Sequence, residues 1–221
     1  SAASDVYKRQ VLDQPQRASA FNQFYQQHMQ VIQQRLARYQ DPKPTVLLQL
    51  HLGRRNECCV TAVNGSLGEV LSLAGGDNIA GKTLAGVFGR LNEEAVIVAH
   101  PDFYFATGSG DSGDSSDLKI GPAISSAETR ASLIQLTAQQ NGLKQLRALH
   151  NGHAAALWHN FYLSPWHVAA AEFFAKTLYP DRFKDVDPEH TLQQIFTTFL
   201  PVPYSGTYFY SLEKALSLIH I

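Results

Sequence analysis

The chain has 221 residues, of which 44% are hydrophobic and 17% charged, and its formal net charge is −1. This is ordinary globular composition, with enough length for one sizeable core or two small ones. A charge so close to zero gives no electrostatic footprint for nucleic acid, and no uninterrupted apolar run approaches the ~20 residues of a membrane-spanning helix. The two cysteines, Cys58 and Cys59, are adjacent, so a bridge between them would be strained and no disulfide framework is expected.

One short DNA sequence, translated from each of its two strands, explains both ends of the chain. Asp5–Gln10 can be encoded by GAT GTG TAT AAG AGA CAG, whose reverse complement, CTG TCT CTT ATA CAC ATC, translates as Leu216–Ile221. This DNA sequence resembles the transposon end used to prepare sequencing libraries. We therefore interpret residues 1–10 and 216–221 as sequencing-adaptor read-through. The reading frame is then a truncated gene, and a missing export signal carries no information.

A long amphipathic helix is predicted over Ser19–Tyr39, before Asp41–Pro44 ends it. At ~1.5 Å per residue it spans roughly 30 Å, the width of a small domain. Apolar residues recur along it at spacings of three and four and form one face: Phe21, Phe24, Tyr25, Met29, Ile32, Leu36 and Tyr39. Without a partner lobe this face would be exposed and prone to aggregation.

After the helix, apolar runs alternate with helical patterns. Strands are predicted at 45–52, 58–62, 103–106 and 154–158, and helices at 66–73, 93–99, 126–139, 143–149, 166–178 and 188–199. The segment 77–90 is predicted to be a loop, 108–122 a flexible surface loop, and 201–211 an aromatic tail. This order predicts a three-layer α/β lobe with a largely parallel sheet.

Ligands of such sheets bind beyond the carboxyl ends of the strands. Arg54 and Arg55 follow the first strand, and their guanidinium groups suit carboxylate, catecholate or phosphate groups. A solvated loop pair is an equally good interpretation of the two arginines.

The loop after the strand at 154–158 is aromatic. Trp158, Phe161 and Tyr162 offer flat surface for an organic chelate, although aromatic residues at strand ends more often belong to the core. Tyr162 or His159 can also bind iron directly, but a lone histidine is more often simply hydrogen-bonded.

Two other patterns carry no function. Gly110–Gly113 has the look of a serine-protease nucleophile motif, but Asp114 stands where a glycine belongs, and trypsin-like enzymes are built from β-barrels. His150 and His153 flank a turn without a third ligand nearby, so no zinc site is expected there.

Several short sequence motifs, in a fixed order along the chain, indicate a family resemblance. Pro44–Leu48 follows the long helix, Leu73–Ile79 reads Leu-Ala-Gly-Gly-Asp-Asn-Ile, Glu94 precedes Pro101-Asp102, and Ser164-Pro165 opens a late helix. Together they resemble the substrate-binding proteins of ABC importers for iron–siderophore, haem and cobalamin. The resemblance runs from Ser19 to Leu212. The Trp158–Pro165 block with Phe199–Tyr208 looks like one iron-complex subgroup.

The resemblance implies a rigid helix that bridges two α/β lobes, with ligand held between them. Residues 11–43 would be a remnant and the inter-lobe helix, and 44–215 the C-terminal ligand-binding lobe, with the N-terminal lobe lost upstream. Glu94 would dock an arginine pocket of the permease, although Glu93 can substitute for it and helix-dipole compensation also explains an acidic first turn. Phe88 would line the ligand, together with Trp158, His159 and Tyr162.

The function expected is therefore capture of an iron chelate and its delivery to an inner-membrane ABC permease. The protein would be a monomer without cofactor or enzymatic activity, located in the periplasm or lipid-anchored on the outer face of the cytoplasmic membrane. One alternative is an enzyme of the nitrogenase-component or chelatase type, against which the scarcity of cysteine counts. The other is a relative that binds bare metal ions, which needs three or four converging ligands where the histidines look scattered.

Overall fold

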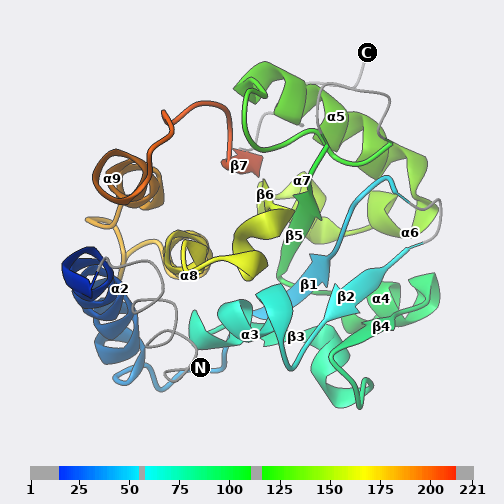
Figure 1. Ribbon diagram of the computed structural model, residues 1–221. Helices are drawn as coiled ribbons and strands as arrows, with labels where there is room; N and C mark the ends of the chain where they lie inside the picture. Colours follow the sequence, from blue (N-terminus) through cyan, green and yellow to red (C-terminus); the bar gives the residue numbers. More distant parts are fainter. Residues whose placement is uncertain (1–14, 55–57, 111–115, 213–221) are drawn as a thin grey trace.

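The computed structural model describes residues 15–54, 58–110 and 116–212, and its centre is a five-stranded sheet of order β3-β1-β5-β6-β7 (Figure 1). The first four strands in this order run parallel, and β7 pairs antiparallel with β6 at one edge. The bounds are β1 (Thr45–Gln49), β3 (Asp77–Asn78), β5 (Phe103–Gly108), β6 (Ala154–Trp158) and β7 (Phe209–Leu212). A second, two-stranded antiparallel sheet joins β2 (Val60–Ala62) to β4 (Phe88–Arg90).

Helices cover both faces of the large sheet, as Figure 1 shows. One face carries α2 (Pro15–Leu36), α3 (Ser66–Leu73), α8 (His167–Leu178) and α9 (Pro188–Phe199). The other carries α4 (Glu93–Ala99), α5 (Ser126–Gln139), α6 (Asn141–Lys144) and α7 (Arg147–His150). Two 3-10 helices, η1 (Ile79–Lys82) and η2 (His159–Leu163), follow β3 and β6. The predicted three-layer α/β fold with a largely parallel sheet is confirmed.

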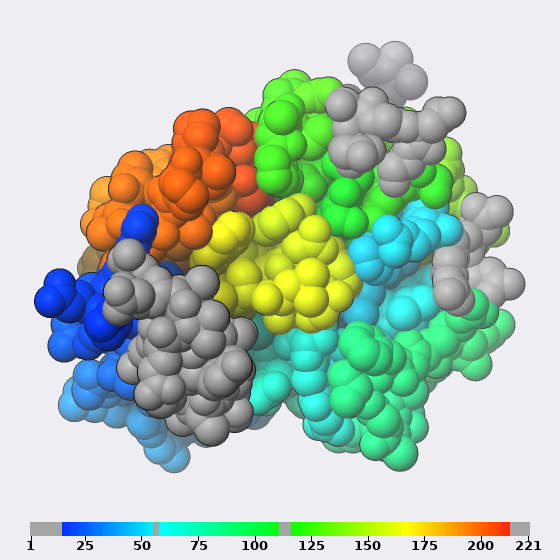
Figure 2. Space-filling view, viewed as in Figure 1, coloured from blue at the N-terminus to red at the C-terminus, as the bar shows by residue number. Residues whose placement is uncertain are grey.

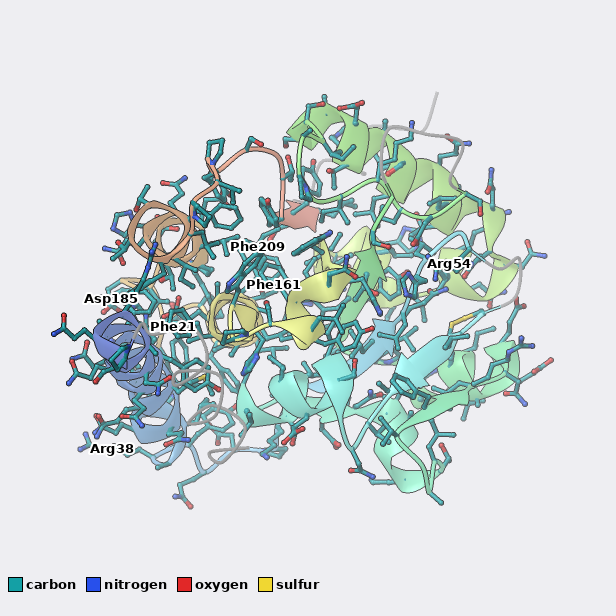
Figure 3. The ribbon with its side chains drawn as sticks, viewed as in Figure 1. Phe21, Arg38, Arg54, Phe161, Asp185 and Phe209 are labelled. Carbon is teal, nitrogen blue, oxygen red and sulfur yellow. A yellow bond between two sulfur atoms is a disulfide. The ribbon has the colours of Figure 1, made fainter. Side chains whose placement is uncertain are left out.

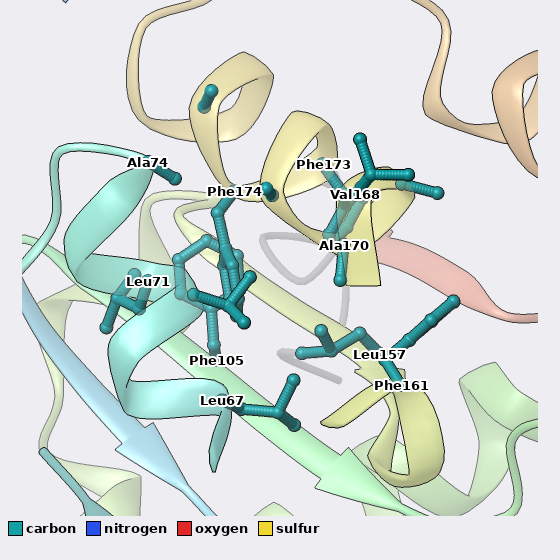
Figure 4. Close-up of a cluster of buried hydrophobic side chains, with 14 of the residues drawn as sticks. Leu67, Leu71, Ala74, Phe105, Leu157, Phe161, Val168, Ala170, Phe173 and Phe174 are labelled. Atoms are coloured by element: carbon teal, nitrogen blue, oxygen red, sulfur yellow. The ribbon is translucent and has the colours of Figure 1, made fainter. Parts of the chain in front are cut away.

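The strands are apolar almost throughout because each side of the sheet is covered by helices. Along β5, Tyr104 belongs to the α5 side of the sheet and Phe105 to the α8 side, as the two-residue period of a strand requires. The Phe105 ring meets the Phe174 ring of α8 edge to face, with centroids 4.8 Å apart (Figure 4). Leu67 and Leu71 of α3 close the same cluster, which fixes both helices against the sheet.

The long helix differs from its prediction in one important respect. It begins at Pro15 and ends at Leu36, a few residues earlier than predicted, and its apolar face is covered by α8 and α9. Ile32 is fully buried, and the Phe21 ring packs edge-on against Phe199 with centroids 5.1 Å apart. The prediction that this face would be exposed was therefore wrong.

Polar contacts reinforce this docking. Arg35 donates from both terminal nitrogens to the Asp185 carboxylate at 2.7 and 2.8 Å, next to α2 (Figure 3). This hydrogen bonding lowers the pKa of Asp185 to about 2. Deeper in the interface, His28 Nδ1 lies 2.6 Å from Oε1 of Glu172, a carboxylate that is almost fully buried.

Three short strands and one buried segment were not predicted. β3, β4 and β7 lie where loops or a tail were expected, and the helix predicted at 143–149 is divided between α6 and α7. The segment 108–122 was expected to lie on the surface, yet Leu118 and Ile120 are fully buried in the α5-side core. That prediction was wrong for the second half of the segment, where apolar residues alternate with polar ones.

Helix ends and the cysteine pair complete the comparison. The Asn92 side chain caps α4 by accepting from the N–H of Ala95, and the Asp187 side chain caps α9 by accepting from the N–H groups of Glu189 and His190. The sulfur atoms of the adjacent residues Cys58 and Cys59 are joined as a disulfide. Within the described ranges, no helix is both long and apolar enough to cross a membrane.

Candidate ligand-binding site

The site begins at His51, just beyond the end of β1. Its backbone adopts the left-handed region with φ 50°, which turns the chain away from the sheet. The flanking Leu50 and Leu52 are buried and hold this turn in place. The backbone N–H of His51 donates to Thr107 Oγ1 at 3.0 Å, and Leu52 N–H donates to the Thr107 carbonyl at 2.9 Å. The ends of β1 and β5 are thereby tied together.

Asp117 is the polar centre of the site, with a side chain that is 1% exposed. Its Oδ2 accepts from His51 Nδ1 at 2.8 Å and lies 3.4 Å from a guanidinium nitrogen of Arg54. It also accepts from the N–H and hydroxyl of Ser109 at 3.3 and 3.2 Å, while Oδ1 accepts from Leu118 N–H at 3.1 Å. These bonds compensate the desolvation of a buried carboxylate and fix it in one position.

His159, the first residue of η2, brings the end of β6 to the same place. Its Nδ1 lies 2.8 Å from Thr107 Oγ1, and its ring lies against that of His51 with centroids 3.6 Å apart and the ring planes tilted by 36°. Burial, and next the charges of His51 and Arg54, lower the pKa of His159 to about 3, while Asp117 opposes the shift. The imidazole is therefore neutral at physiological pH.

Aromatic rings extend the site along η2. Tyr162 is 39% exposed, and its ring meets His159 edge to face with centroids 5.1 Å apart. Trp158 is half-buried in the aromatic cluster of the α8 side, stacked on Trp166 and edge-on to Tyr208. In the space-filling view, yellow atoms that include η2 border green and cyan atoms on one face (Figure 2).

The other predicted residues are distributed differently. The Arg54 side chain is 56% exposed, and a guanidinium nitrogen lies 3.4 Å from Asp117 Oδ2. Figure 3 labels Arg54 in the chain beyond β1. Arg55 lies outside the described residues. Phe88 is 59% exposed on β4. Among the residues that the structure describes, no contact joins Phe88 to His51, Asp117 or His159. Glu94 is exposed in the first turn of α4, whereas Glu93 is half-buried beside Gly142.

Two members of the site were missed from sequence. His51 was taken as part of a strand, although a histidine just after a buried apolar run marks the carboxyl end where ligands bind. Asp117 was lost within a Gly-, Ser- and Asp-rich segment. Among the described residues, no group of three or more His, Cys, Asp or Glu is placed to hold a metal ion.

The structure is an α/β lobe with a cluster of polar and aromatic side chains at the carboxyl ends of β1, β5 and β6. Residues 10–158 match the family of periplasmic binding proteins, and the chain belongs to that family. This confirms the resemblance drawn from sequence and the expectation that the chain is not an enzyme. Among curated protein sequences, none matches the chain.

Several solved structures are similar to this chain. It is similar to the TroA-like periplasmic binding protein FepB from Veillonella parvula, with 29% identity and a TM-score of 0.85 over 93% of this chain and 59% of that one. CeuE from Helicobacter pylori gives 14% identity and a TM-score of 0.61 over 89% of this chain and 56% of that one. A periplasmic heme binding protein from Pseudomonas aeruginosa gives 22% and 0.54 over 78% and 56%. This chain spans less than two thirds of the length of these relatives.

Proposed function

We propose that this chain is the inter-lobe helix (11–43) and C-terminal lobe (44–215) of an ABC-importer binding protein that carries an iron chelate. The observation that supports this most directly is the polar and aromatic edge formed by Arg54, His159 and Tyr162 at the carboxyl ends of β1 and β6. The fold of the chain is similar to that of FepB, with a TM-score of 0.85.

The chemistry of this edge suits an anionic organic chelate. The Arg54 guanidinium is oriented by Asp117 while more than half of its surface faces solvent, so it can still pair with a ligand oxygen. Tyr162 offers a partly exposed ring in η2, where it meets His159 edge to face. Trp158 contributes the part of its ring that the aromatic cluster leaves uncovered, and Phe88 and Arg55 are further ligand contacts of the proposal.

Delivery requires a permease, and Glu94 is the proposed docking residue. Its carboxylate stands on the surface at the start of α4, where a partner's arginine can reach it. Glu93 is half-buried and is less able to take this role. The periplasm, or the outer face of the cytoplasmic membrane with a lipid anchor, is the location that this function implies.

The test uses the full-length protein encoded by the complete gene. Ferric siderophores, haem and cobalamin are titrated against tryptophan fluorescence, which Trp158 and Trp166 report from beside the site. We expect sub-micromolar quenching by a ferric catecholate or hydroxamate that is lost in Arg54→Ala. The matched control is Arg38→Ala, an exposed arginine on the helix side of the chain that should leave binding unchanged. No response to any chelate, with tight binding of bare metal ions instead, would refute the proposal and favour the metal-ion relative.

A further inference from the structure

A surface cavity of about 370 Å³ lies at the end of α2, and Gln34, Arg35, Arg38 and Arg182 line it. No carboxylate is among the described residues that line this cavity. Its volume is that of a small-molecule site, but such sites are mostly lined by apolar side chains. The chain passes from this end of α2 to the amino end of β1, so the cavity lies far from the carboxyl edge of the sheet. In Figure 3, Arg38 and Arg54 are accordingly labelled on opposite sides of the molecule.

Arg35 is held in place and its charge is compensated. Its terminal nitrogens donate to the Asp185 carboxylate at 2.7 and 2.8 Å, and one of them also donates to the Arg182 carbonyl at 2.7 Å. Its guanidinium carbon lies 5.4 Å from the centroid of the buried Phe183 ring. These contacts hold together the two segments that line the cavity, the end of α2 and the chain after α8.

The other two guanidinium groups keep their charge. Among the residues that the structure describes, neither Arg38 nor Arg182 forms an ion pair with a carboxylate. The Arg182 guanidinium lies over the Tyr39 ring, 5.0 Å from its centroid, and Tyr179 packs edge-on against that ring at 4.8 Å. A guanidinium over an aromatic ring keeps N–H groups at its edge for other partners. Compensation of the α2 dipole accounts for basic residues at the end of that helix, but not for Arg182, which belongs to another segment.

Two uncompensated positive charges match one phosphate group. A phosphate monoester carries about −1.5 to −2 charges at pH 7, together with three strong acceptor oxygens, whereas a carboxylate carries a single charge. Guanidinium groups bind phosphate oxygens through paired N–H donors. We propose that this cavity binds a phosphate group, carried either by a small soluble phosphate compound or by a phospholipid headgroup. The inference concerns a second site and does not depend on the proposed chelate site.

The experiment uses the full-length protein encoded by the complete gene, at low ionic strength because salt screens exposed charges. Inorganic phosphate and glycerol phosphate are titrated by calorimetry. Flotation with phosphatidylcholine vesicles, with and without phosphatidic acid, tests the lipid source. We expect phosphate binding that weakens about five- to tenfold in Arg38→Gln and in Arg182→Gln, since each removes one charged donor group.

Two further variants make the test specific. Arg130→Gln is the matched control, because it removes the same charge from an exposed position on α5 and should leave phosphate binding unchanged. Asp185→Asn removes the counter-charge of Arg35 and should tighten phosphate binding by roughly twofold to fivefold. An effect of opposite sign at Asp185 is not expected from a merely structural role of this ion pair.

Each outcome decides the inference. Binding of the soluble compounds identifies a free phosphate ligand, and binding of phosphatidic acid vesicles alone identifies a lipid headgroup. Binding in neither assay overturns the inference, and so does an equal loss in Arg130→Gln, because the effect is then one of net charge. If Arg182→Gln melts early through lost packing on Tyr39, the exposed Arg38→Gln decides. Chelate affinity should be unchanged in Arg38→Gln, so failure of the proposed function and failure of this inference are distinguishable.

Discussion

Asp117 is predicted to stabilise the lobe far more than an exposed carboxylate in an ion pair does. Removing one partner of a buried ion pair costs roughly 3–5 kcal/mol, because the partner groups are left unpaired. In Asp117→Ala the donors of Ser109 and Leu118 lose their acceptor, but His51 and Arg54 are 23% and 56% exposed and regain water. We therefore expect the lower end, about 3 kcal/mol, which corresponds to a fall in melting temperature of roughly 6–12 °C for a chain of this size.

Urea unfolding followed by circular dichroism measures this loss. If the slope of the unfolding free energy against urea concentration is the same in both proteins, the shift in midpoint reports the change in stability. The matched control is Asp185→Ala, which breaks the ion pair with Arg35 on the surface of α2, where the Asp185 side chain is 62% exposed. That loss should be close to experimental error, because water and salt screen exposed pairs. Equal losses in the two variants would show that Asp117 does not hold the site together.

Three further predictions follow from the packing and charges of the lobe. Phe174→Ala should cost about 3–5 kcal/mol in urea unfolding, because the ring is fully buried, whereas Phe88→Ala, 59% exposed, should cost far less. The pKa of His159 is about 3, below the ~6.5 of a histidine in an unfolded chain, so below about pH 6.5 the unfolded state binds a proton that the folded state does not. The free energy of unfolding should therefore be highest above about pH 6.5 and fall as the pH drops toward about 3. In His159→Phe this fall should be less steep. Glu94→Ala should reduce ATP-driven uptake in reconstituted vesicles without changing chelate affinity, whereas the half-buried Glu93 should give a smaller transport defect when changed to Gln.

The parts of the fold that were predictable are those whose signal is local. Val46–Leu48 is apolar without alternation, and both faces of β1 are in fact buried. Asn92 stands before an acidic helical turn and caps α4. By contrast, Phe209–Leu212 becomes a strand only through pairing with β6, about 55 residues earlier in the chain. Its aromatic residues are equally suited to an irregular tail, so nothing local distinguishes the two.

The site divides in the same way. Arg54, His159 and Tyr162 were predicted because parallel strands place their carboxyl ends at one edge, and that rule needs only the strand positions. The His51–Asp117 contact joins residues 66 positions apart. Asp117 is one of several acidic residues in a polar segment, and its residue type does not indicate that its side chain is buried. The apolar Leu118 and Ile120 beside it were the available signal that the segment returns to the core.

The long helix α2 and the segment that follows η2 are joined by a short chain of hydrogen bonds. His167 Nδ1 lies 2.8 Å from the Ser164 carbonyl, so it carries the proton, and Tyr25 of α2 donates its hydroxyl to Nε2 at 2.8 Å. Ser164 directly follows η2, which carries His159 and Tyr162. Separating α2 from this loop would break that path and also uncover the carboxylate of Glu172. If the chain is the lobe of the proposed function, we therefore expect ligand binding to move α2 and η2 as one body, with bending confined to segments outside their interface.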